Sequence, residues 1–150
     1  MAFNVEPLKI NYKTLEEFKQ FHEYGQQELS MLEDLQENII ENNSSSPFYG
    51  IYMGDKLVAR MSLYRRASED SDVFETKQEF LELWKLEVLP DYQSRGLGTR
   101  LVSYAKDYGF AIKTNSRMKS KDFWEKNGFI APCYKIERDL GQNPMIWEPN

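Results

Sequence analysis

The sequence has very little cysteine and histidine: one of each, Cys133 and His22, in 150 residues. A single cysteine cannot form a disulfide within the chain, which fits a reducing compartment such as the cytoplasm. No apolar run approaches the roughly 20 residues of a membrane span, and residues 1–10 lack the regions of a signal peptide. The net charge of −5 argues against nucleic acid as a partner and allows a cationic substrate. We expect a single cytoplasmic domain over residues 1–150, with no membrane and no metal.

The most informative segment is Gln93-Ser94-Arg95-Gly96-Leu97-Gly98, which lies between a predicted strand and a predicted helix. Its glycines allow unusual turn conformations and a close approach of the backbone to a ligand. Their amides, with those at the start of the helix, form a positive concavity that suits a pyrophosphate. Arg95 and Arg100 can add charge-assisted hydrogen bonds. The segment therefore predicts a phosphate-binding loop, against the alternative of a simple turn.

Two other glycine-rich phosphate loops fit the neighbouring residues less well. A Walker loop needs lysine and then serine or threonine after its second glycine, whereas Gly98 is followed by Thr99-Arg100. A dinucleotide-binding fingerprint needs three glycines near the start of a series of βαβ units, and only two occur here, beyond the middle of the chain.

The glycine loop, preceded by Val88-Leu89-Pro90, resembles motif A of the GNAT (Gcn5-related) acetyltransferases. Downstream, Asn115 and the run from Phe123 to Phe129 resemble the second conserved segment of that family, with Trp124 where tyrosine is usual. The two segments together, at this separation, are far more specific than either alone. The chain also resembles, nearly from end to end, the YlbP-like group of uncharacterised acetyltransferases of Bacillus and its relatives, including residues 46–52.

The residue pattern predicts an α/β fold, a mixed and mostly antiparallel central sheet flanked by helices, in the order β-α-α-β-β-β-α-β-α-β-β, which is the order of the GNAT fold. A capping box of Thr14 and Glu17 would start the first helix, and Leu29, Leu32, Gln36 and Ile39 would form the stripe of the second. Gly54-Asp55 is a hairpin turn signal, and Ser120 can cap a brief helix that Gly128 ends. Strands are expected at 8–12, 48–53, 57–65, 79–88, 110–114, 134–138 and 145–148.

The resemblance implies acetyl-CoA as co-substrate and acetyl transfer to an amine by direct attack in a ternary complex. The amides of the glycine loop would hold the pyrophosphate, the backbone at the end of the strand before it would pair with the pantetheine arm, and Asn115 and Phe123 would contact or line that arm. The cofactor-binding residues expected are Leu86, Val88, Gln93, Ser94, Arg95, Gly96, Leu97, Gly98, Thr99, Asn115 and Phe123.

The reaction needs a neutral amine, and a carboxylate acting directly or through water can supply it. In histone-modifying members of the family a glutamate lies eleven positions before the glycine motif, which corresponds to Glu82. Glu82 is therefore the candidate base and Glu87 the second candidate. The alternative is that Glu82 is a solvated strand residue, or an ion-pair partner of Lys85 or Arg60.

Trp124 cannot replace the family's tyrosine as the acid that protonates the leaving thiolate, because an indole N–H is only a weak donor. Tyr104, Tyr134 or water would have to serve, or the protein is instead a non-catalytic acyl-CoA-binding module. Trp124 itself is more readily explained as a residue that packs over the CoA arm. His22 and Cys133 are more readily explained as packed residues than as catalytic groups.

The run Glu69-Asp70-Ser71-Asp72 is an ordinary solvated loop or a feature that attracts a cationic amine. The acceptor, a small-molecule or protein amine, cannot be named from the sequence. Exposed strand edges are compatible with a homodimer.

Overall fold

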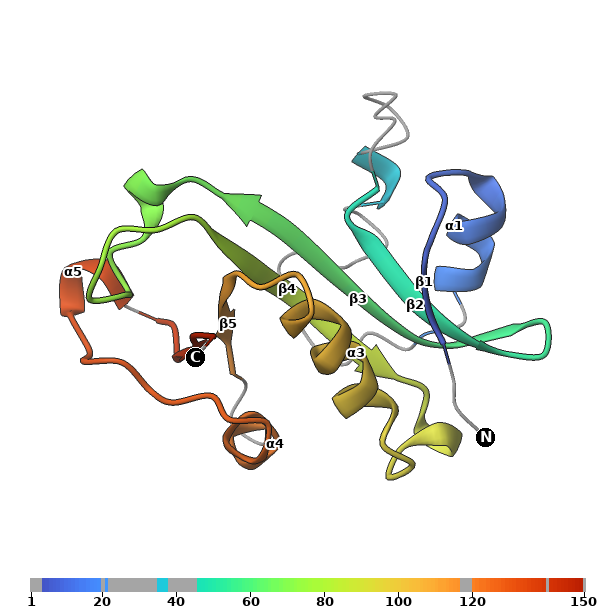
Figure 1. The fold of residues 1–150 in the computed structure, drawn as a ribbon. Coiled ribbons are helices and arrows are strands. Elements are labelled where there is room, and N and C mark those ends of the chain that lie inside the picture. The colour runs from blue at the N-terminus through green and yellow to red at the C-terminus, as the bar shows by residue number, and fades with distance from the viewer. Residues whose placement is uncertain are drawn as a thin grey trace. The chain divides into compact units, whose positions relative to one another are not determined.

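The computed structural model describes residues 4–19, 21, 35–37, 46–116, 120–139 and 141–149. In these ranges the strands form one sheet in the order β1-β2-β3-β4-β5-β6. Figure 1 labels β1 to β5. Its elements are β1 (Val5–Pro7), α1 (Tyr12–Phe18), β2 (Phe48–Met53), β3 (Lys56–Arg66), η1 (Ser68–Asp70), β4 (Phe80–Val88), η2 (Pro90–Tyr92), α3 (Leu97–Lys106), β5 (Ala111–Asn115), α4 (Lys121–Lys126), α5 (Ile136–Asp139) and β6 (Pro144–Trp147). β1 with β2, β2 with β3 and β5 with β6 pair antiparallel, and β4 with β5 pairs parallel. The predicted fold class, a mixed and mostly antiparallel sheet with helices, is confirmed.

The chain divides into two compact units. The first is formed by Met1–Ser62 and Lys85–Leu101, and the second by Leu63–Trp84 and Val102–Asn150. Three elements, β3, β4 and α3, therefore contribute residues to both units. Each unit is described separately below.

In the first unit, the predicted hairpin of β2 and β3 is confirmed, with Gly54 at φ +63° in its turn. The first strand is Val5–Pro7 rather than residues 8–12, because the following residues start α1. Asn11 is the N-cap of that helix, since its side chain accepts a hydrogen bond from the Thr14 amide at 2.9 Å. The predicted capping box headed by Thr14 is therefore wrong.

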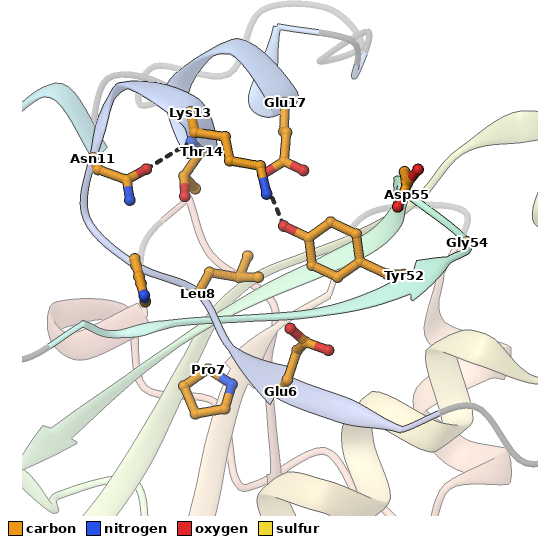
Figure 2. Close-up of a pocket in the computed structure, with 11 residues that line it drawn as sticks. Glu6, Pro7, Leu8, Asn11, Lys13, Thr14, Glu17, Tyr52, Gly54 and Asp55 are labelled. Carbon is orange, nitrogen blue, oxygen red and sulfur yellow. Dashed lines mark hydrogen bonds between the residues drawn. The ribbon is translucent and has the colours of Figure 1, made fainter.

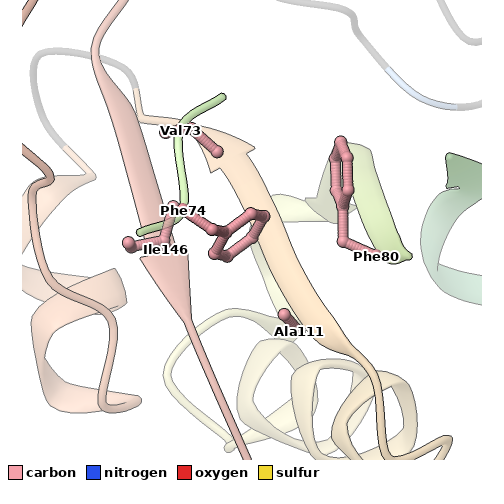
Figure 3. Packing of buried hydrophobic residues seen from close by; sticks show 5 residues of the cluster. All are labelled: Val73, Phe74, Phe80, Ala111 and Ile146. Atoms are coloured by element: carbon pink, nitrogen blue, oxygen red, sulfur yellow. The ribbon is translucent and has the colours of Figure 1, made fainter. Parts of the chain in front are cut away.

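In the second unit, apolar side chains from a loop and three strands pack together (Figure 3). The cluster comprises Val73, Phe74, Phe80, Ala111 and Ile146. The rings of Phe74 and Phe80 lie with their centroids 5.3 Å apart. The loop after β3 thus reaches the core through Val73 and Phe74, which anchors the segment before β4.

The predicted strand at 134–138 is wrong, because Tyr134 and Lys135 have no regular secondary structure and the short helix α5 begins at Ile136. The buried carboxylate of Asp139 explains the difference. It accepts hydrogen bonds from Arg138 Nε and Nη2 at 2.7 and 2.6 Å and from the Lys135 amide at 3.0 Å. Arg138 also donates to the carbonyl of Cys133, which is exposed rather than packed in a strand. Local hydrogen bonds therefore replace a sheet ladder in this segment.

Some predictions fall outside the described residues: His22 and most of the predicted second helix, including Leu29, Leu32 and Ile39. Among the helices of the described ranges, none combines the length and apolar character needed to cross a membrane.

Candidate cofactor-binding and catalytic site

The pairing of β4 with β5 ends at Leu83, before the end of β4. The last paired residues are Leu83 and Thr114, and the Thr114 hydroxyl donates to the Leu83 carbonyl at 2.9 Å. In the described part of the chain, Leu86 and Val88 have no pairing partner in β5. An open strand edge of this kind can accept an extended ligand as an additional strand.

Beyond β4 the chain makes a strained turn. The Gln93 side chain donates from Nε2 to the Val88 carbonyl at 3.0 Å, so it shapes the loop rather than pointing freely toward a ligand. Ser94 and Gly96 have φ values of +64° and +80°. A serine in this left-handed region is uncommon, and such strain is concentrated at functional sites.

The helix α3 starts directly from this turn. The Gly96 carbonyl accepts a hydrogen bond from the Arg100 amide at 3.0 Å, which makes Gly96 the N-cap. The first amides of a helix have no acceptor inside the helix, and a glycine has no side chain with which to cap them. A Cβ atom added to Gly96 would meet nothing within 4 Å. The loop therefore presents the amides of Leu97, Gly98 and Thr99 beside open space, as anion binding requires.

Basic side chains lie around the same loop. Arg95 lies over the ring of Tyr92, with its guanidinium carbon 5.4 Å from the ring centroid. Lys56 Nζ, from the start of β3, lies 5.6 Å from that centroid. Neither Tyr92 nor Lys56 was identified from the sequence, and the only local signal was an aromatic residue directly before the glycine motif. The first unit thus contains most of the predicted cofactor-binding residues, namely Leu86, Val88 and the loop from Gln93 to Thr99.

The other two predicted cofactor contacts, Asn115 and Phe123, belong to the second unit. Asn115 ends β5, and its Oδ1 atom is buried without a hydrogen-bond partner among the residues that the structure describes. A buried acceptor without a partner in the protein suits an N–H donor from a ligand. The amides of a pantetheine arm are such donors, so Asn115 fits the implied cofactor.

Trp124, where the family usually has tyrosine, is buried in α4 at 5% exposure. Its ring makes edge contacts with Phe123 and Phe129 at centroid distances of 5.0 and 5.1 Å. Lys106 lies over the Phe129 ring and donates to the Asn127 carbonyl. The tryptophan is therefore a core residue of the second unit.

Both candidate bases form ion pairs. Glu82 Oε1 accepts from Arg66 Nε at 2.7 Å, so its partner is neither Lys85 nor Arg60. Glu87 Oε1 accepts from Arg60 Nη2 at 2.9 Å.

Arg60 is completely buried, and its pair with Glu87 ties that partly exposed side chain to the core of the first unit. Its guanidinium carbon lies 4.7 and 4.3 Å from the ring centroids of Phe18 and Phe21. Glu87 is thereby held by a fully buried partner, whereas the partner of Glu82, Arg66, is 37% accessible, so Glu82 remains the first candidate base.

The two candidate acids differ in their surroundings. Burial, and then the hydrogen bond shared with the Tyr108 hydroxyl, raise the pKa of Tyr104 to about 12. Tyr104 therefore remains a protonated phenol at neutral pH. Tyr134 is 54% exposed in the segment before α5.

A separate pocket of about 600 Å³ lies in the first unit, beside α1, β1 and the β2–β3 turn (Figure 2). It is lined by Glu6, Pro7, Leu8, Lys9, Asn11, Lys13, Thr14, Glu17, Tyr52, Gly54 and Asp55, none of which is a predicted site residue. The Tyr52 hydroxyl donates to Glu17 Oε1 at 2.7 Å. Burial and this bond raise the pKa of Tyr52.

Comparison with known proteins agrees with the geometry of the glycine loop. The model of the acetyltransferase (GNAT) family matches residues 11–129. The chain belongs to this family, and the class of protein that fold and loop define is an acetyltransferase.

Among individual proteins, an uncharacterized N-acetyltransferase of Bacillus velezensis is 63% identical over 146 residues, 97% of this chain and 91% of that protein. The crystal structure of the N-acetyltransferase YlbP of Bacillus subtilis in complex with coenzyme A matches with a TM-score of 0.83 and 61% identity, covering 99% of this chain and 97% of that one. The predicted resemblance to the YlbP-like group is confirmed.

Proposed function

We propose that the protein transfers the acetyl group of acetyl-CoA to an amine by direct attack in a ternary complex. The observation that carries this proposal is the loop from Gln93 to Thr99, where Ser94 and Gly96 in the left-handed region lead directly into the N-terminus of α3. It is supported by family membership and by the coenzyme A in the crystal structure of the YlbP relative.

In this proposal the loop amides hold the pyrophosphate, with Arg95 nearby, and the open edge of β4 at Leu86 and Val88 takes the pantetheine arm. Asn115 Oδ1 accepts a hydrogen bond from the same arm, and Phe123 lines it. We propose residues 1–150 as a single acetyltransferase domain. We place the protein in the cytoplasm, and a homodimer remains a prediction.

The bound thioester supplies an acyl group that an amine can attack. Glu82, directly or through water, takes one proton from the acceptor's ammonium group, because only a neutral nitrogen can attack. The N–C bond then forms as the C–S bond breaks, the nitrogen loses a second proton, and the thiolate gains one. Tyr104 or Tyr134 is proposed as the donor to the thiolate, with water as the alternative.

The first test is calorimetric titration of acetyl-CoA into the wild type and a Gly96→Trp variant. The indole would fill the open space beside the loop amides, so we expect binding by the wild type and its loss in the variant. Absence of binding to the wild type would refute the proposed co-substrate.

The catalytic assignment needs a second pair of variants. Glu82→Gln should abolish thiol release from acetyl-CoA in the presence of an acceptor and preserve CoA affinity. Glu79→Gln is a matched control, because Glu79 forms an exposed pair with Arg65 just before β4. Intact CoA binding without turnover by the wild type, across a broad panel of amines, would favour the non-catalytic acyl-CoA-binding module.

A further inference from the structure

The pair of Glu82 and Arg66 differs from two other ion pairs that the structure describes near these strands. The Arg65–Glu79 pair is exposed on both sides, at 62% and 52%, and the Arg60–Glu87 pair is buried, at 0% and 15%. In the Arg66–Glu82 pair the glutamate side chain is largely covered, at 13%, whereas the arginine side chain is partly accessible, at 37%. A partly accessible arginine side chain beside a sheltered glutamate side chain is neither a surface pair nor a core pair.

The pair also leaves hydrogen-bonding capacity unused. It joins Arg66 Nε to Glu82 Oε1 at 2.7 Å. Within the described ranges, the two terminal nitrogens of Arg66 and Oε2 of Glu82 make no further hydrogen bond. The terminal nitrogens of an arginine form a fork that matches a carboxylate, and the free oxygen of a glutamate can accept from an ammonium group.

Two aromatic rings stand next to the pair on the same strands. Tyr64 and Trp84 lie two residues from Arg66 and Glu82 along β3 and β4, so they share their face of the sheet. Their rings form an edge contact at a centroid distance of 6.5 Å, and the Arg66 guanidinium carbon lies 5.1 Å from the centroid of Tyr64. The rings add apolar surface beside the two charges.

From this arrangement we propose that the acceptor is a free α-amino acid or a close analogue, an amine with a carboxylate on the neighbouring carbon. Its amine binds at Glu82 Oε2, its carboxylate at the fork of Arg66, and its side chain against Tyr64 and Trp84. Arg66 determines specificity and, through Nε, positions Glu82. The inference rests on the proposed function for the catalytic role of Glu82.

The test uses matched pairs that differ only in the carboxylate: tyrosine and tyramine, phenylalanine and phenethylamine, leucine and isoamylamine. We expect the wild type to acetylate the amino acids with a kcat/KM about 10- to 100-fold higher, the effect of one charge-assisted contact. Arg66→Gln should remove this preference, mainly by raising KM for the amino acids. Arg66→Lys, which keeps the charge without the fork, should retain part of it.

Arg65→Gln is the control, because it breaks the neighbouring exposed pair and should leave the preference unchanged. Circular dichroism establishes that each variant is folded. Equal or better use of the decarboxylated amines by the wild type, or an unchanged preference in Arg66→Gln, overturns the inference and leaves the proposed function standing.

Amino-acid binding is measured separately by saturation-transfer NMR with coenzyme A present. Binding by the wild type and its loss in Arg66→Gln supports the recognition site even without turnover, a result that counts only against the proposed function. No amino-acid binding by the wild type refutes the inference.

Discussion

Replacing Gly96 with alanine tests whether coenzyme A binding depends on the backbone conformation of the glycine loop, and not only on the empty space beside it. Gly96 has φ +80°, and a Cβ there would meet no protein atom within 4 Å. The substitution therefore causes no steric clash inside the protein. It acts through backbone strain and through the methyl group that would stand in the open space beside the loop.

The strain can be estimated and must appear in one of two places. An L-residue in the left-handed region costs about 1–2 kcal/mol. If the loop keeps its conformation, the free energy of unfolding falls by that amount. If the free protein relaxes to a negative φ, the same energy weakens ligand binding by about 5- to 30-fold. In that second case the loss of one amide–phosphate hydrogen bond adds about 1.5–3 kcal/mol, so coenzyme A affinity should fall at least about 10-fold.

Gly54 is a matched control. It also has a positive φ, +63°, and a Cβ there would meet no atom within 4 Å. It lies in the β2–β3 turn and not in the glycine loop. Calorimetry and urea unfolding are measured for both alanine variants. Gly54→Ala should lose about 1 kcal/mol of stability and bind coenzyme A like the wild type. If Gly96→Ala binds coenzyme A within about 2-fold of the wild type and also keeps the free energy of unfolding of the wild type, strain and amide geometry are not what the loop contributes, and the reasoning fails.

Three further predictions concern stability. Arg60→Met should cost about 3 kcal/mol in urea unfolding, because it leaves the Glu87 carboxylate without its buried partner, whereas Arg65→Met should cost less than about 1 kcal/mol. The Arg138 guanidinium next to Asp139 lowers the pKa of that carboxyl. The stability that the Asp139 carboxylate contributes is therefore complete above its unfolded pKa and is lost as the pH falls through its folded pKa. Asp139→Asn should lower the Tm at pH 7 and have the same Tm as the wild type in strong acid, and an equal Tm difference at all pH values would contradict this. The pKa of Tyr104 is raised to about 12, so the neutral phenol contributes stability that is present below its unfolded pKa of about 10 and is lost as the pH rises toward 12. In Tyr104→Phe the stability should therefore fall less between about pH 10 and 12 than in the wild type, as followed by circular dichroism.

The parts of the fold that the sequence predicted well are those encoded by neighbouring residues. Gly54-Asp55 specifies a hairpin turn by its own conformational preference, and the glycine motif specifies a strand-to-helix turn in the same way. The start of the first helix was misplaced because Asn11 and Thr14 are both good capping residues. Which of them caps depends on where β1 ends, and that is decided by its pairing with β2.

The ion-pair partners could not be predicted for a related reason. Whether Glu82 meets Arg60 or Arg66 depends on how β3 and β4 are aligned, and local sequence does not determine that alignment. Lys85 lies three residues from Glu82 on β4 itself, and side chains three apart on a strand point to opposite faces. The 134–138 segment alternates apolar and charged residues as a strand does. Its structure is instead decided by the buried carboxylate of Asp139, which has no periodic signal.

The division of the chain has a consequence for attempts to isolate either unit. The changes from one unit to the other, at Ser62/Leu63, Trp84/Lys85 and Leu101/Val102, all fall inside a strand or a helix. A truncation at any of these positions would cut through hydrogen-bonded backbone, and neither unit corresponds to one continuous stretch of chain. Fragments that begin or end there should be poor autonomous folders, so the protein is best divided, for labelling or permutation, at the exposed Gly54-Asp55 turn.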